Sequence, residues 1–185
     1  MIKTTLILFI CFSGFALQAQ SISERDVDSS GNITIITTLD TLASEPNYCY
    51  TEGVIYNSDS VNYYGLVFYF DAHQIFFLTA KDKIQIRFDD GEVYDDFVIT
   101  DGEFISDGEL VKIMFPIVKN ALNKMLRNSV TSITLITEKF RHTIKVDEAY
   151  NLTFQTLSEY MLNINPYDKN GIMWSELTKW KFPEN

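Results

Sequence analysis

The side chains best suited to chemistry are gathered in an acidic segment at residues 88–110, FDDGEVYDDFVITDGEFISDGEL. The segment has nine acids and no base, and Asp-Gly-Glu occurs three times, at residues 90–92, 101–103 and 107–109. Oxygen-rich loops around glycine can bind Ca²⁺, whose sites take about six to eight oxygen ligands. The candidate metal ligands are Asp95, Asp101 and Asp107. Tight turns also require Asp-Gly pairs, so solvated turns are the first interpretation and a Ca²⁺ site is the second.

Tyrosine and phenylalanine are concentrated between residues 48 and 70. Sugars and apolar ligands bind aromatic surfaces, so this stretch could line a binding cleft. Its candidate ligand-binding residues are Tyr63, Tyr64 and Tyr69. The same residue types favour strands and fill cores, which makes core filling the first interpretation of the stretch as a whole.

No pattern typical of a known catalytic site occurs in the chain. The only histidines are His73 and His142, and HExxH, GxSxG, Walker A and GxGxxG are all missing. Paired carboxylates could hydrolyse a glycosidic bond, but adjacent Asp95 and Asp96 point to opposite faces of a strand. We therefore predict no catalytic residue and no cofactor apart from the Ca²⁺ considered above. Cys49 lies in a strand-like sequence and is interpreted as a small buried hydrophobe.

The elements that must position these residues begin with a series of short strands from residue 32 to about residue 115. Residues 83–88 alternate between apolar and polar side chains, and Asp90-Gly91 then predicts a tight hairpin. The returning strand is expected to place Val93, Phe97 and Ile99 on its core face. Asp95 falls on that same face, so the pattern predicts a bulge that turns this carboxylate outward.

Two helices are expected, at about residues 116–128 and 148–164. Pro116 would open the first helix, with Val118, Leu122 and Met125 forming its buried stripe. Phe154, Leu157, Met161 and Ile164 recur at helical spacing in the second. The predicted fold class is therefore α+β, a mainly antiparallel sheet with both helices packed on one face. A β-barrel with appended helices is the alternative. Near the end of the chain, Trp174, Leu177 and Trp180 are spaced three apart, which suits a short docked helix.

The first nineteen residues have the layout of a secretory signal peptide. Lys3 supplies a positive start, and an apolar region at residues 6–17 is too short to span a membrane, which takes about 20 apolar residues. The ending LQAQS at residues 17–21 resembles the export signals of small secreted proteins from Bacteroidota. Such a signal implies a periplasmic or extracellular protein. We divide the rest into a flexible segment at residues 20–31 and a single domain at residues 32–185.

Composition limits the function classes. With a formal net charge of −10 and 46% hydrophobic residues, the chain is expected to fold and to repel nucleic acid and anionic lipid. We expect no membrane insertion after signal cleavage. The favoured function is binding of an envelope or extracellular protein, a peptide or a glycan. A carboxylate-based hydrolase and a Ca²⁺-dependent binding module are the alternatives. A large pocket with convergent acids would favour the enzyme, whereas an exposed apolar patch would favour partner binding.

Overall fold

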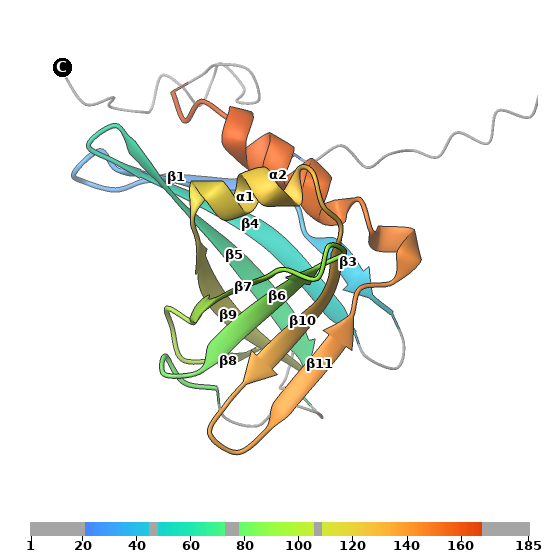
Figure 1. Ribbon diagram of the computed structural model, residues 1–185. Helices are drawn as coiled ribbons and strands as arrows, with labels where there is room; N and C mark the ends of the chain where they lie inside the picture. Colours follow the sequence, from blue (N-terminus) through green and yellow to red (C-terminus); the bar gives the residue numbers. More distant parts are fainter. Residues whose placement is uncertain (1–20, 45–47, 73–77, 106–108, 168–185) are drawn as a thin grey trace, which may run out of the picture.

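A computed structural model describes residues 21–44, 48–72, 78–105 and 109–167 (Figure 1). Strands hold 51% of these residues and helices hold 15%. The predicted α+β class is therefore wrong, because the described chain is mostly β. Two antiparallel sheets curl around one core, and the two helices lie together at one end of this half-barrel (Figure 1). The strands pair antiparallel as predicted, and the barrel-like alternative is closer to the observed architecture than a single sheet carrying both helices on one face.

The larger sheet has seven strands in the order β1-β2-β4-β5-β9-β8, and β3 also pairs with β4. Their bounds are Ile22–Val27 for β1, Ile33–Thr37 for β2, Asp40–Ala43 for β3, Cys49–Ser58 for β4, Val61–Asp71 for β5, Glu103–Ile105 for β8 and Leu110–Ile117 for β9. Strand β1 lies inside the segment that the sequence had marked as flexible. It is held there by antiparallel pairing with β2.

The smaller sheet has the order β11-β10-β6-β7, with β6 at Lys83–Phe88, β7 at Val93–Phe97, β10 at Val130–Ile136 and β11 at Arg141–Lys145. The β6–β7 register runs without interruption, so the bulge predicted near Asp95 does not form. Strand β7 instead turns toward the core the face that was expected to point to solvent. Val93, Asp95 and Phe97 face solvent, while Tyr94 points inward and its ring contacts Phe115 edge-on at 5.7 Å.

Backbone hydrogen bonds join the two sheets at both borders. The Val98 N–H donates to the Asp82 carbonyl at 3.0 Å, and the next residue, Ile99, donates to the Met114 carbonyl at 2.8 Å. Two consecutive residues that follow β7 therefore bond to different sheets, Val98 beside β6 and Ile99 to β9. At the opposite border, the Asp147 N–H donates to the Leu42 carbonyl at 3.0 Å, which ties the end of β11 to β3. These contacts curl the sheets toward each other.

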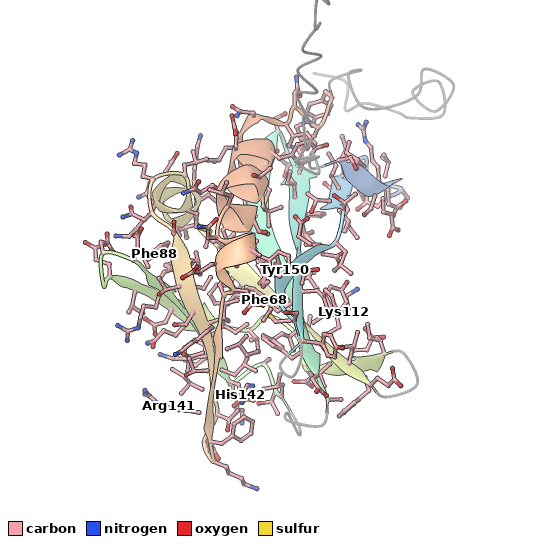
Figure 2. All side chains as sticks on the ribbon, turned by 90° about the vertical axis from the view of Figure 1, so that its right-hand side faces the viewer. Phe68, Phe88, Lys112, Arg141, His142 and Tyr150 are labelled. Carbon is pink, nitrogen blue, oxygen red and sulfur yellow. The ribbon has the colours of Figure 1, made fainter. Side chains whose placement is uncertain are left out.

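The core fills the space between the sheets. In β9 every second side chain is buried, which is the period expected of a strand with one face in the core. Phe68 lies at the centre (Figure 2), and its ring centroid is 5.8 Å from that of Phe70, 6.3 Å from that of Phe115 and 6.4 Å from that of Phe154. Outward-facing side chains such as Arg141 point away from this core (Figure 2).

The helices are shorter than predicted. Helix α1 spans Lys119–Met125 and helix α2 spans Thr153–Asn163, preceded by a 3-10 turn, η2, at Glu148–Tyr150. Pro116 does not open α1, because β9 continues through it to Ile117. Leu122 and Met125 are buried as expected, but Val118 is the extended residue that precedes the helix and is exposed. No helix within these described ranges has the length and apolarity needed to cross a membrane.

Candidate functional site

The first Asp-Gly-Glu triplet forms the turn between β6 and β7. Gly91 has a φ of 84°, a left-handed conformation that favours glycine, and the Asp90 carboxylate accepts a hydrogen bond from the Glu92 N–H at 2.9 Å. Lys124 of α1 forms ion pairs with Asp90 at 2.8 Å and with Glu92. Its ammonium also lies 5.0 Å from the centroid of the Phe88 ring. These acids therefore anchor a hairpin to a helix.

The two described candidate metal ligands, Asp95 and Asp101, have different partners within the protein. Asp95 faces solvent on β7 and forms an ion pair with Lys83 at 3.6 Å. Asp101 accepts a hydrogen bond from the Ala80 N–H at 2.9 Å, and Asp107 lies outside the described residues. Within the described parts of the chain, no three His, Cys, Asp or Glu side chains form a group that could hold a metal ion. The acids described here act in turns and ion pairs.

The Lys124 contacts predict a pH-dependent effect on stability. Hydrogen bonding to Lys124 lowers the pKa of Asp90 below its ordinary value of 3.8, and the same bond raises the pKa of Lys124 above 10.5. The pair therefore stabilises the fold above pH 3.8 and below pH 10.5, and the contribution of Asp90 is lost as the pH falls through its lowered pKa. We expect Lys124→Met to lower the melting temperature at pH 7 and to have a smaller effect at pH 2.5. Thermal unfolding followed by circular dichroism measures this. An equal loss at both pH values would contradict it.

The three candidate tyrosines have different environments. Tyr69 is buried, and its hydroxyl donates to the Glu52 carboxylate at 2.5 Å. Burial, and then that hydrogen bond, raises the pKa of Tyr69. This tyrosine therefore supplies a hydrogen bond to a buried acid. Tyr63 and Tyr64 instead line a groove where β5 begins.

The groove has a volume of about 640 Å³ and lies between the start of β5, the end of β9, Ile99 and the start of α1. Its lining residues are Ser60, Asn62, Tyr63, Tyr64, Ile99, Pro116, Ile117, Val118 and Lys119. Three apolar side chains in it are unusually open to water, with exposed fractions of 57% for Tyr63, 50% for Ile99 and 53% for Val118. They come from three separate segments. The fold thus assembles an exposed apolar surface around one depression.

Local sequence explains part of this arrangement. A two-residue turn, Asp59-Ser60, joins β4 to β5 with positive φ at both residues, as tight hairpins require. The hairpin sets Tyr56 opposite Tyr63, with ring centroids 6.3 Å apart. Ile99 and Val118 were missed as groove residues because both were expected to face the core. The alternation of β9 offered one signal: burial at Ile117 puts the next residue on the outer side.

A second cavity, of about 510 Å³, lies between the loop before β6 and the β10–β11 turn. Its lining includes two acids, Asp82 and Glu138, so it is the cavity to consider for the alternative function, a carboxylate-based hydrolase. The Asp82 carboxylate accepts hydrogen bonds from the N–H of Thr79 at 2.7 Å and from its hydroxyl at 3.3 Å. Asp82 therefore holds its own turn together, which is a structural role.

The remaining titratable candidates lie on separate elements. Burial lowers the pKa of His142 on β11 and raises the pKa of the Cys49 thiol, which stays protonated as a core side chain. Burial also raises the pKa of Asp40, at the start of β3, to about 6. His73 lies outside the described residues. None of the three described groups, His142, Cys49 and Asp40, lines the groove.

Of the two cavities described, the groove is therefore the better candidate site. Its lining combines two tyrosines, three aliphatic side chains and a proline with the polar side chains of Ser60 and Asn62 and one charged residue, Lys119. No protein-family model, no curated protein and no solved structure matches this chain.

Proposed function

We propose that this protein is exported and acts by binding a partner in the groove. The observation that carries the proposal is the exposure of Tyr63, Ile99 and Val118, from three segments, around a single depression. Exposed apolar side chains gathered in this way are typical of sites that bind protein or ligand. Export rests on residues 1–19 alone, which lie outside the described residues.

The chemistry of the groove indicates the partner. Aromatic and aliphatic walls bind apolar side chains, and tyrosine is enriched where binding energy is concentrated. The net charge of −10 would attract a basic partner over a longer range. We therefore propose a polypeptide segment with apolar side chains flanked by lysine or arginine. A glycan is the second candidate, because Ser60, Asn62 and Lys119 add polar groups beside the two tyrosine rings.

A peptide-display selection on the immobilised protein tests this proposal. We expect enrichment of peptides that combine aromatic or aliphatic residues with lysine or arginine. Val118→Asp should weaken the best peptide at least about tenfold, because a carboxylate buried against apolar groups loses more than about 1.4 kcal/mol of binding free energy.

Leu152→Asp is the matched control. Leu152 precedes α2 as Val118 precedes α1, both lack a side-chain cap hydrogen bond, and Leu152 is 50% exposed. Both side chains are exposed, so neither variant should unfold the protein. Leu152→Asp should bind the selected peptide like the wild type. Selection of no peptide, or equal weakening by both variants, would refute the proposal. Binding of the protein to immobilised glycans, with no peptide selected, would also refute the proposed peptide partner.

A further inference from the structure

We propose that the outer face of the smaller sheet binds an acidic polypeptide segment in an extended conformation. Figure 1 shows this sheet, β11-β10-β6-β7, in front of the larger one, and no described helix or strand covers its outer face. The surface is separate from the groove, so the inference does not depend on the proposed function.

The strand registers place twelve side chains on this outer face, in three rows that each cross β11, β10, β6 and β7. The rows are Lys145-Ser132-Arg87-Val93, Thr143-Thr134-Gln85-Asp95 and Arg141-Ile136-Lys83-Phe97, and together they form what we call the basic face. The basic face has four bases and one acid, whereas the whole protein has 15 bases and 25 acids. A sheet needs polar side chains toward water but no particular sign of charge. The gathering of bases on one face of an acidic protein therefore indicates an anionic partner.

The four cations lie at the corners of the basic face. Lys83 and Arg87 are four residues apart on β6, which corresponds to about 13 Å along the strand. Arg141 and Lys145 have the same spacing on β11. Only β10 separates the two strands, so the two pairs are about 10 Å apart. An extended polypeptide has the same repeat as these strands, and acids at positions i and i + 4 of such a segment therefore match Arg141 and Lys145.

Most of these cations are available to a partner. Arg87, Arg141 and Lys145 are exposed, and the side chains of these three form no ion pair with any described residue. Lys83 forms an ion pair with Asp95 at 3.6 Å, and its ammonium lies 4.6 Å from the centroid of the Phe97 ring. A partner can thus bind three of the four cations without breaking an existing ion pair.

The acids in the turns that border the basic face are held by other parts of the fold. Asp90 and Glu92 form ion pairs with the lysine of α1. The Asp147 carboxylate, beyond the end of β11, accepts hydrogen bonds from the N–H and the hydroxyl of a serine that follows β3. Glu138, in the β10–β11 turn, is followed directly by a lysine, Lys139. These acids leave the excess of positive charge on the basic face in place.

The middle row of the basic face favours a polypeptide over other polyanions. Gln85, Thr134 and Thr143 supply an amide and two hydroxyls, and the two threonine hydroxyls are hydrogen-bonded to each other at 2.9 Å. Such groups can bond the peptide groups of an extended segment. The one aromatic ring of this face, Phe97, lies on β7 beneath Lys83. Sugars and unpaired bases bind by stacking on aromatic rings, which the middle of the face does not offer.

A fluorescein-labelled peptide of alternating glutamate and threonine tests the proposal, because its glutamates share one side when the chain is extended. We expect saturable binding to the purified protein by fluorescence anisotropy, weakening as salt is added. Arg141→Gln/Lys145→Gln should weaken binding about fivefold or more, because two of the contacted cations are removed. Asp95→Asn should tighten binding about twofold, because it removes the one acid of the face and releases Lys83.

Lys112→Gln/Arg127→Gln is the matched control. It removes the same formal charge from β9 of the larger sheet and from the end of α1, away from the basic face. Its affinity for the peptide should stay within about twofold of the wild type, because charges far from a bound peptide are screened by salt. Far-ultraviolet circular dichroism shows that each variant is folded. Arg141→Gln/Lys145→Gln should bind a groove-selected peptide like the wild type, so the two proposals succeed or fail separately.

Four results would overturn the proposal. The first is no saturable binding of the alternating peptide, and the second is equal weakening by the two double variants. The third is tighter binding of heparin or single-stranded DNA than of the peptide, with the same dependence on Arg141 and Lys145, which would assign the face to a different polyanion. The fourth is self-association of the wild type that Arg141→Gln/Lys145→Gln abolishes in sedimentation experiments, which would assign the face to a second copy of the chain.

Discussion

Leu122→Ala should lower the free energy of unfolding by about 2–5 kcal/mol, the range for truncating a fully buried leucine. Leu122 has no exposed surface and lies in α1 among the core residues contributed by both sheets. Removing its side chain leaves a cavity that helices and sheets close only in part. Urea unfolding followed by circular dichroism measures the loss, with the midpoint shifted and the slope unchanged.

Val118→Ala and Lys119→Ala are the controls for this result. Both residues are exposed at the start of α1, so each change should stay within about 0.5 kcal/mol of the wild type. If Val118 belonged to a buried stripe with Leu122 and Met125, as the sequence predicted, Val118→Ala would lower the free energy of unfolding about as much as Leu122→Ala. Equal losses for Leu122→Ala and Val118→Ala would show that α1 does not pack as described.

Gly53→Ala should destabilise the protein by about 1–3 kcal/mol, because β4 has no room for a methyl group where α2 packs on it. A Cβ at Gly53 would lie 2.6 Å from the Met161 sulfur and 3.0 Å from a methyl carbon of Leu157. Both side chains belong to α2 and are buried. The Met161 side chain would have to shift within its tightly packed contacts between α2 and β4 to make room.

Gly65→Ala is the matched control for Gly53→Ala. Gly65 is also buried inside a strand, but a Cβ there would meet its nearest atom, the Phe115 carbonyl oxygen, at an ordinary 3.5 Å. Gly65→Ala should leave the free energy of unfolding unchanged or raise it by up to about 1 kcal/mol, because alanine makes the unfolded chain less flexible. Gly53→Ala should also cost less in a Met161→Ala background, as a double-mutant cycle measures. Equal costs in the two backgrounds would contradict the contact with Met161.

Local patterns predicted the individual elements well where the period was clear. Residues 83–88 form the alternating strand expected of them, and Asp90-Gly91 forms the expected turn, with Gly91 at positive φ. Phe154, Leu157 and Met161 are buried on one side of α2, as their spacing predicted. These features depend on side chains within a few residues of one another. A short window of sequence therefore contains the information that decides them.

The fold class could not be read in the same way. Strands were recognised, but their curling depends on contacts between distant residues, such as Ile99 with Met114 and Asp147 with Leu42. Whether two sheets face each other or lie in one plane changes no local period. The prediction of one sheet with helices on a single face was wrong for this reason. The same limit applies to β7, where the core face was assigned to Val93 and Phe97 and not to Tyr94.

The sequence by itself predicted the alternating strand at residues 83–88, the buried side chains of α2 and the turn that closes the β6–β7 hairpin, and it proposed Tyr63 and Tyr64 as binding residues. Only the tertiary structure decided that these two tyrosines line a groove, that Tyr69 is buried on Glu52, and that Ile99 and Val118 are exposed. The physical reason is that burial is not a property of a side chain or of its spacing. A residue at the end of an element is covered or left open by whichever distant segment packs there, and at Ile99 and Val118 the described structure leaves both open.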